Sequence, residues 1–128
     1  HFKQINDSFG HQAGDAYLQA LGAFLHNRAR PEDIVCRYGG EEFVLILPDT
    51  TLADAQDLAA QLCRDIERLH VEYQGQSLES VTASAGVAAY PEHGLTNQAL
   101  LLAADRALYQ AKAAGRNEVM IAHPVPGQ

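Results

Sequence analysis

Two β-rich runs, residues 34–38 and 43–47, lie on either side of the pair Gly39–Gly40. Glycine tolerates the positive φ angles of the shortest hairpin turns, so the runs are predicted to pair as an antiparallel hairpin with both glycines at its turn. The second run is continuously apolar, which is typical of a strand covered on both faces. The fold must therefore include antiparallel pairing, with one of these strands near the centre of a sheet.

Segments with helical periodicity flank this hairpin. Apolar residues recur with helical spacing over residues 14–28, 51–69 and 100–111, whereas residues 81–89 and 118–122 are strand-like and residues 70–80 suggest a short hairpin or loop. This order predicts an α/β domain in which an antiparallel pair forms part of a helix-covered sheet.

Residues at the ends of these segments support the boundaries. Thr51 with Asp54 is typical of a capping box, and Thr96 is a predicted N-cap. Gly115 is placed to end the third helix in the left-handed region.

Composition limits what the chain can do. With 128 residues, 47% of them hydrophobic, we expect one domain over residues 1–122 and a tail over 123–128. The net charge of −7 argues against duplex nucleic acid as a partner, and no apolar run is long enough to cross a membrane. Cys36 and Cys63 lie in apolar segments and are predicted to be reduced core thiols, which suits the cytoplasm.

Two adjacent carboxylates, Glu41 and Glu42, follow the glycines of the hairpin. Neighbouring carboxylates repel each other, so a divalent cation such as Mg²⁺ often compensates such a pair. An ordinary hairpin with a solvated acidic pair is the alternative, and the local physics alone leaves it open. The six histidines show no spacing typical of a zinc site.

The segment Gly39-Gly40-Glu41-Glu42-Phe43 resembles the signature of the GGDEF family of diguanylate cyclases, in its GGEEF form. Three further segments resemble family motifs in the same order: Phe2-Lys3-Gln4-Ile5-Asn6-Asp7 with Gly10-His11 and Gly14-Asp15, then Ser84-Ala85-Gly86-Val87-Ala88, then Ala104-Asp105-Arg106-Ala107-Leu108-Tyr109-Gln110-Ala111-Lys112 with Gly115-Arg116-Asn117. Together they cover residues 1–121.

The resemblance implies a palm-like nucleotide cyclase fold, with a mixed, mainly antiparallel sheet flanked by helices. It also implies a first strand ending in D-x-D, which we expect before His1 and which is absent from this chain. Without that strand and its metal-binding aspartate, we expect the chain as given to be inactive.

The resemblance assigns catalysis and metal binding to Glu41 and Glu42, with Mg²⁺ or Mn²⁺ as the cofactor. Glu41 is the candidate to help deprotonate the attacking 3′-hydroxyl. Gly39 and Gly40 would contact the nucleotide through their backbone.

It further assigns guanine recognition to Asn6 and Asp15, which favours GTP. A carboxylate at position 15 can accept hydrogen bonds from guanine N1–H and the exocyclic amine, a pair of donors that adenine lacks. An Asx turn at Asn6 and a helix-start acid at Asp15 are the ordinary alternatives.

The cations Lys3, Lys112 and Arg116 match the family's triphosphate-binding residues. Lys112 and Arg116 are four residues apart near a predicted helix end, so charges that complement the helix dipole are the alternative.

Residues Arg30 and Asp33 resemble the family's inhibitory R-x-x-D site, which binds the product cyclic di-GMP. A loop with a simple salt bridge is the alternative. Asp57 and Gln61 occupy positions where the family often has a further arginine, so Arg64 is a doubtful substitute and inhibition is expected to be weak.

The function implied is condensation of two GTP into cyclic di-GMP and two pyrophosphates by a homodimer, under the control of an upstream sensory or dimerisation domain. The alternative is a catalytically silent GGDEF module that binds GTP or cyclic di-GMP and regulates an attached domain. An interaction domain without a nucleotide site would require four accidental motif matches.

Overall fold

The computed structural model describes residues 10–39, 41–78 and 81–123. The chain divides into two compact units, each made of two segments of the sequence. The first unit comprises His1–Asp49 and Ile66–Val81, and the second comprises Thr50–Asp65 and Thr82–Gln128.

Helix α2 (His11–Arg28) is the long helix of the first unit. Its apolar residues recur on one face and are buried there: Ala13, Tyr17, Leu18 and Leu25. Burial raises the pKa of the Tyr17 phenol, while a hydrogen bond with the backbone of Val81 acts in the opposite direction. The helix stops at Ala29, which is extended, and Pro31 follows.

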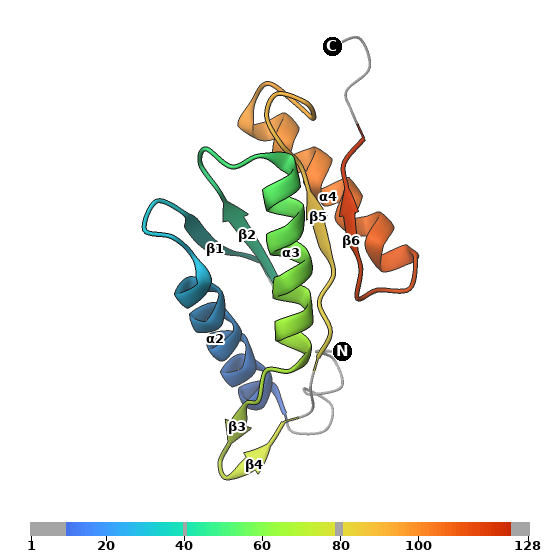
Figure 1. Cartoon of the computed structure of the whole chain (residues 1–128). Helices are drawn as coiled ribbons and strands as arrows, with labels where there is room; N and C mark the ends of the chain where they lie inside the picture. The colour runs from blue at the N-terminus through green and yellow to red at the C-terminus, as the bar shows by residue number, and fades with distance from the viewer. Residues whose placement is uncertain (1–9, 40, 79–80, 124–128) are drawn as a thin grey trace. The chain divides into compact units, whose positions relative to one another are not determined.

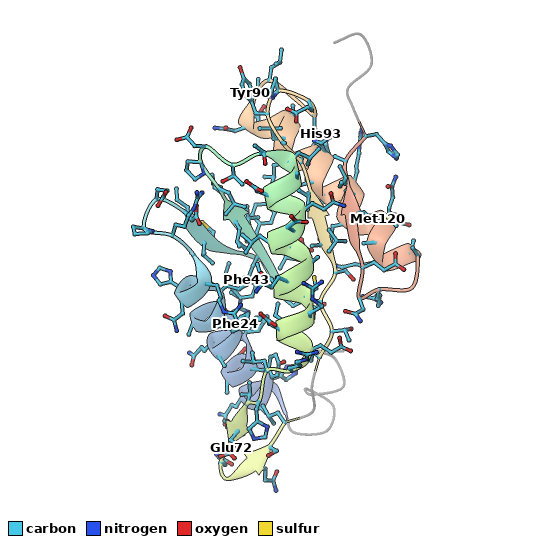
Figure 2. All side chains as sticks on the ribbon, viewed as in Figure 1. Phe24, Phe43, Glu72, Tyr90, His93 and Met120 are labelled. Carbon is cyan, nitrogen blue, oxygen red and sulfur yellow. The ribbon has the colours of Figure 1, made fainter. Side chains whose placement is uncertain are left out.

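Strands β1 (Ile34–Gly39) and β2 (Glu42–Ile46) form an antiparallel hairpin in the same unit. Residues of β2 alternate between two faces, and Phe43 faces α2, where its ring lies against the position a Cβ would take at Gly22 (Figure 2). Ile34, Cys36 and Ile46 lie on the opposite face and are exposed.

A second small hairpin pairs β3 (Glu72–Tyr73) with β4 (Gln76–Ser77). Its turn residues Gln74 and Gly75 have φ angles of 51° and 79°, the left-handed values of a tight hairpin turn. The Tyr73 hydroxyl donates to Oε1 of Gln12, 3.0 Å away, and so connects this hairpin to the start of α2.

The second unit contains most of α3 (Leu52–Glu67) and a strand–helix–strand arrangement of β5 (Ala85–Val87), α4 (Asn97–Ala113) and β6 (Val119–Ile121). The strands are parallel, with Ala85 opposite Val119 and Val87 opposite Ile121. Parallel neighbours need a crossover connection, and α4 provides it by packing on both strands (Figure 1).

Close contact between β5 and α4 depends on Gly86. A Cβ at this position would overlap the backbone of α4 at Ala104 and Leu108. Glycine is therefore the residue that allows the strand and helix backbones to approach each other.

Both predicted N-caps are confirmed. The Thr51 hydroxyl accepts from the Asp54 backbone N–H at 3.1 Å, and the Thr96 hydroxyl accepts from Ala99 at the same distance. These bonds satisfy backbone donors that the first turn of a helix leaves without partners.

The predicted α/β class, with mainly antiparallel pairing, is confirmed: two of the strand pairs are antiparallel and one is parallel. The strand predicted over residues 81–89 is shorter than expected, because β6 supplies only three paired residues. The predicted domain bounds stay a prediction, and residues 124–128 of the tail lie outside the described residues.

Three local expectations need correction. The hairpin turn was expected at Gly39 and Gly40, but Gly39 ends β1 opposite Glu42, so Glu41 lies in the turn and Gly39 does not. A register shift between Arg37 and Gly39 moves the turn by one residue. Cys36 is exposed, because the register puts it on the face opposite α2, whereas Cys63 is buried as expected.

The third correction concerns β2, which was expected to be covered on both faces. It pairs with β1 alone among the strands of the described residues, and Ile46 remains 50% exposed.

None of the described helices is long and apolar enough to span a membrane.

Candidate active site

The acidic turn, defined by Glu41 and Glu42 at the connection between β1 and β2, carries both predicted metal-binding carboxylates. Glu41 is exposed in the turn, and Glu42 is partly buried as the first residue of β2. Within the part of the chain that the structure describes, neither forms a salt bridge. Their carboxylate oxygens are thus not paired with a cationic side chain of the described residues.

This pair is chemically suited to part of a magnesium site. Mg²⁺ is commonly bound by one or two carboxylates together with substrate phosphates and water, so two adjacent glutamates can supply part of its oxygen ligands. The described residues contain no cluster of three or more histidine, cysteine, aspartate or glutamate side chains that could hold a metal by themselves. Any metal here would depend on the nucleotide or on further ligands.

Of the predicted guanine-reading pair, Asp15 is within the described residues and Asn6 is outside them, as are Lys3 and Gly40. Asp15 is exposed on α2, one turn after His11. The first turn of α2 contains no acidic residue, so Asp15 is not placed to complement the helix dipole. The ordinary alternative for Asp15 is therefore not supported, and its carboxylate is open to solvent.

The cationic turn, residues 114–118, follows α4 in the second unit. Lys112 is in the last turn of the helix, whereas Arg116 lies beyond its end and is exposed. The backbone N–H groups of Gly115 and Arg116 donate to the carbonyls of Lys112 and Ala111, at 3.4 and 3.0 Å, which is the pattern of a Schellman cap.

Dipole complementation accounts for Lys112 better than for Arg116, since the effect falls off within the last turn. In the described part of the chain, neither cation forms a salt bridge. Within the described residues of the second unit, both cations are therefore without a salt bridge.

The predicted product site at Arg30 and Asp33 contains a tight ion pair. Arg30 Nη2 lies 2.8 Å from Asp33 Oδ1 and also donates to the Pro48 carbonyl at 2.9 Å. The Asp33 side chain is 3% exposed and accepts from the Arg30 backbone N–H. The Arg30 guanidinium, as a hydrogen-bond donor, holds the pKa of Asp33 below its ordinary value.

This geometry includes the salt bridge that the ordinary alternative requires. Product binding by Arg30 and Asp33 stays a prediction. Asp57, Gln61 and Arg64 are all exposed residues of α3 in the second unit.

Two side chains form hydrogen bonds that were not predicted from the sequence, although Ser84 belongs to one of the family motifs quoted above. Ser84 Oγ accepts from the Asn117 backbone N–H at 2.9 Å. His93, which is 2% exposed, accepts from the Ala89 backbone N–H at 2.8 Å through Nδ1 and fixes the loop before α4 (Figure 2). Each residue is near a loop rather than on a periodic face, so apolar spacing does not reveal it.

A cluster of His70, Glu72 and Ser77 lies at the second hairpin. Nε2 of His70 is 3.3 Å from the Ser77 hydroxyl and 3.5 Å from Glu72 Oε1. A hydrolytic triad needs the serine and the acid on different ring nitrogens, so this exposed cluster does not have the geometry of one.

Comparison with known proteins identifies the family. Residues 1–118 match the family described as "Diguanylate cyclase, GGDEF domain", and the chain belongs to it. The response regulator PleD of Caulobacter vibrioides is 46% identical over 125 residues, covering 93% of this chain. The chain spans 26% of the length of PleD.

Solved structures agree with this family. The GGDEF domain of PA1120 (YfiN or TpbB) from Pseudomonas aeruginosa has a TM-score of 0.87 and 35% identity, covering 98% of this chain and 78% of that one. The GGDEF domain of DgcB from Caulobacter crescentus, in complex with c-di-GMP, has a TM-score of 0.85 and 31% identity, covering 94% and 71%. The predicted GGDEF family and its fold are thereby confirmed.

Proposed function

We propose that this chain is the catalytic domain of a diguanylate cyclase, which condenses two GTP into cyclic di-GMP and two pyrophosphates. The observation that carries the proposal is the acidic turn, where Glu41 and Glu42 are adjacent in the sequence and form no salt bridge with any described residue. An acidic pair left available at a backbone turn suits a metal–nucleotide complex better than a structural role.

In this reaction, each 3′-hydroxyl attacks the α-phosphate of the other nucleotide. Two phosphodiester bonds form as two bonds to pyrophosphate break. Glu41 would accept the proton of the hydroxyl, directly or through water, and Glu42 would support the same site. Glu41 and Glu42 would hold Mg²⁺ or Mn²⁺, which when bound offsets charge that develops on the α-phosphate.

Further residues that the family resemblance assigns to the nucleotide would orient it. Asp15, with Asn6, would bind the guanine edge, and its exposure on α2 is compatible with that role. Lys3, Lys112 and Arg116 would bind the triphosphate; the planar guanidinium of Arg116 suits oriented phosphate contacts. Gly39 and Gly40 would allow close backbone approach.

The chemistry requires two nucleotides to meet, so we propose a homodimer in which each copy presents one GTP. An upstream sensory or dimerisation domain would control that encounter. We also propose a cytoplasmic location, where GTP is available and the free thiols Cys36 and Cys63 would stay reduced. Arg30 and Asp33 would bind cyclic di-GMP as an inhibitory site.

The test is product formation from GTP with Mg²⁺ by the full-length protein, compared with its Glu41→Ala variant. We expect the variant to lose about 100-fold or more of the rate, the scale seen when a group that stabilises transition-state charge is removed. Its thermal unfolding should be unchanged because Glu41 is exposed.

Glu72→Ala is the matched control, since Glu72 is another exposed glutamate on a hairpin of the same unit (Figure 2). It should retain the wild-type rate. Wild-type turnover by Glu41→Ala would remove Glu41 from the mechanism.

A further inference from the structure

The backbone of the cationic turn is left-handed over three successive residues. Gly115, Arg116 and Asn117 have φ angles of 118°, 66° and 52°. Glycine adopts such angles readily and asparagine tolerates them, but a long side chain such as arginine rarely does. Strained residues of this kind persist where the surrounding structure fixes them, often at ligand-binding positions.

Two sets of hydrogen bonds fix this turn. The Schellman bonds at Gly115 and Arg116 come from α4 itself and occur at many helix ends. The other set comes from the segment leading into β5: Ser84 Oγ accepts from Asn117 N–H at 2.9 Å, and Ala85 N–H donates to the Glu118 carbonyl at the same distance. The second set connects positions 33 residues apart in the case of Ser84 and Asn117.

The Ser84 bond is the one that accounts for the third left-handed residue. A Schellman cap needs a single left-handed residue at its C′ position, here Gly115, and leaves the following chain free to become extended. Arg116 and Asn117 instead stay left-handed, and the N–H of Asn117 points to the Ser84 hydroxyl. Arg116 is thus held between a bond to α4 on one side and the Ser84 bond on the other.

We infer that Ser84 is a positioning residue for anion binding by the cationic turn, with the triphosphate of a guanine nucleotide as the anion. Ser84 acts through the Asn117 N–H and does not itself touch the ligand. It fixes the direction in which the exposed Arg116 side chain leaves the backbone, one turn beyond Lys112. This inference rests on the proposed function, which assigns the triphosphate to these cations.

A purely structural serine would behave differently from a positioning serine. Loss of a structural bond would affect stability and the binding of every ligand alike. Loss of a positioning bond weakens the binding of ligands that carry the triphosphate and leaves binding of the bare nucleoside unchanged. In a variant that lacks the Arg116 side chain, the same loss does not weaken triphosphate binding further.

The experiment measures the affinity of the full-length protein for α,β-methylene-GTP, which cannot be cleaved at the reacting bond, and for guanosine, by titration calorimetry. Ser84→Ala should weaken the triphosphate analogue about tenfold, the scale of one charge-assisted contact, without changing guanosine affinity. Ser84→Thr retains the hydroxyl and should retain most of the affinity. It also serves as the informative variant if Ser84→Ala folds poorly.

A double-mutant cycle with Arg116→Ala separates the possible outcomes. On the Arg116→Ala background, Ser84→Ala should change the affinity of the analogue by less than about twofold if the two residues act as a unit. Equal losses on both backgrounds, or parallel loss of guanosine binding, would overturn the positioning role. Normal analogue binding by Arg116→Ala would overturn both this inference and the assignment of the triphosphate to Arg116. If Arg116→Ala weakens binding but Ser84→Ala does not, the positioning role alone fails.

Discussion

The acidic turn and the cationic turn both carry residues that we assign to the nucleotide, yet different interactions hold them. The acidic turn closes an antiparallel ladder between neighbouring segments of the sequence. In the cationic turn, three backbone N–H groups, those of Ala114, Gly115 and Arg116, donate to carbonyls of α4. Two further bonds join Asn117 and Glu118 to Ser84 and Ala85, on a segment far away in the sequence. The first turn is therefore a local structure, whereas the second depends on the packing of its whole unit.

Gly86→Ala should have the largest effect, because it disturbs the strand and helix that build the cationic turn. The added Cβ would overlap the backbone of α4 at Ala104 and Leu108, and backbone cannot move aside as a flexible side chain can. We expect a loss of about 3 kcal/mol in the free energy of unfolding. Urea unfolding followed by circular dichroism measures it.

Gly22→Ala is the matched change beside the hairpin that carries the acidic turn. Its Cβ would lie 3.4 Å from Cε1 of Phe43, which is ordinary contact. Alanine is favoured over glycine within a helix by about 1 kcal/mol, so stability should stay the same or rise slightly. Similar losses in the two variants would contradict the contrast between the turns.

Arg30→Ala tests a loop of the first unit whose charges are already paired. If Arg30 and Asp33 bind cyclic di-GMP, product affinity should fall about tenfold, because charge-assisted bonds to the product are lost. Inhibition should be relieved while the initial rate with GTP changes little. Calorimetry on protein freed of bound product compares the two affinities. Unchanged product affinity would contradict the inhibitory site and support the alternative, a loop with a simple salt bridge.

Arg116→Gly should separate stability from binding at the cationic turn. Glycine removes the strain of a φ angle of 66°, so we expect this variant to be more stable than Arg116→Ala by up to about 1 kcal/mol. Both variants should bind the triphosphate equally poorly, since both lack the guanidinium. Thermal unfolding and calorimetry provide the two readouts.

The control is the same pair of substitutions at Lys112, which lies within α4. There the glycine variant should be the less stable one, by about 1 kcal/mol, because glycine is disfavoured inside a helix. If glycine is also the less stable choice at position 116, the turn is not strained there.

Asp33→Asn should have the smallest effect, and the effect should depend on pH. The pKa of Asp33 is lowered in the folded protein, so the unfolded chain takes up the proton first as the pH falls. The stabilisation is fully present above the ordinary carboxyl pKa, near about 4, and is lost as the pH falls through the lower folded value. The difference between variant and wild type in urea unfolding should therefore shrink between neutral pH and about pH 3.

The corresponding Asp57→Asn change is a useful control, since Asp57 is exposed on α3 and has no salt bridge among the described residues. Because no salt bridge is lost there, Asp57→Asn should cost less stability at neutral pH than Asp33→Asn. A difference at position 33 that stays constant over the same pH range would contradict the role of the Arg30 pairing.

Sequence reasoning performs best where structure is local. The helix caps at Thr51 and Thr96 follow from side chains three residues from their partners, and both are confirmed. The position of the hairpin turn was wrong by one residue, because a register shift before Gly39 cannot be read from the glycines themselves. The same register exposes Cys36, whose apolar neighbours had suggested burial.

In the candidate site, too, local features could be predicted from the sequence and long-range contacts could not. Motif resemblance singles out Glu41 and Arg116, but it does not reveal what fixes the backbone beneath them. The bond between Ser84 and Asn117 joins residues 33 positions apart, and no periodic pattern in the sequence predicts it. Such bonds follow from the packing of β5 and β6 beside α4, which only the three-dimensional structure provides.

The most direct test of the central claim is the product that the full-length protein forms from GTP and from ATP in the presence of Mg²⁺. Chromatography with mass detection identifies the cyclic dinucleotide, and a coupled assay counts pyrophosphate. The account predicts cyclic di-GMP and two pyrophosphates from each pair of GTP molecules, and no cyclic product from ATP, because Asp15 is assigned to the guanine edge. Absence of cyclic di-GMP with GTP, or equal turnover of both nucleotides, would contradict it.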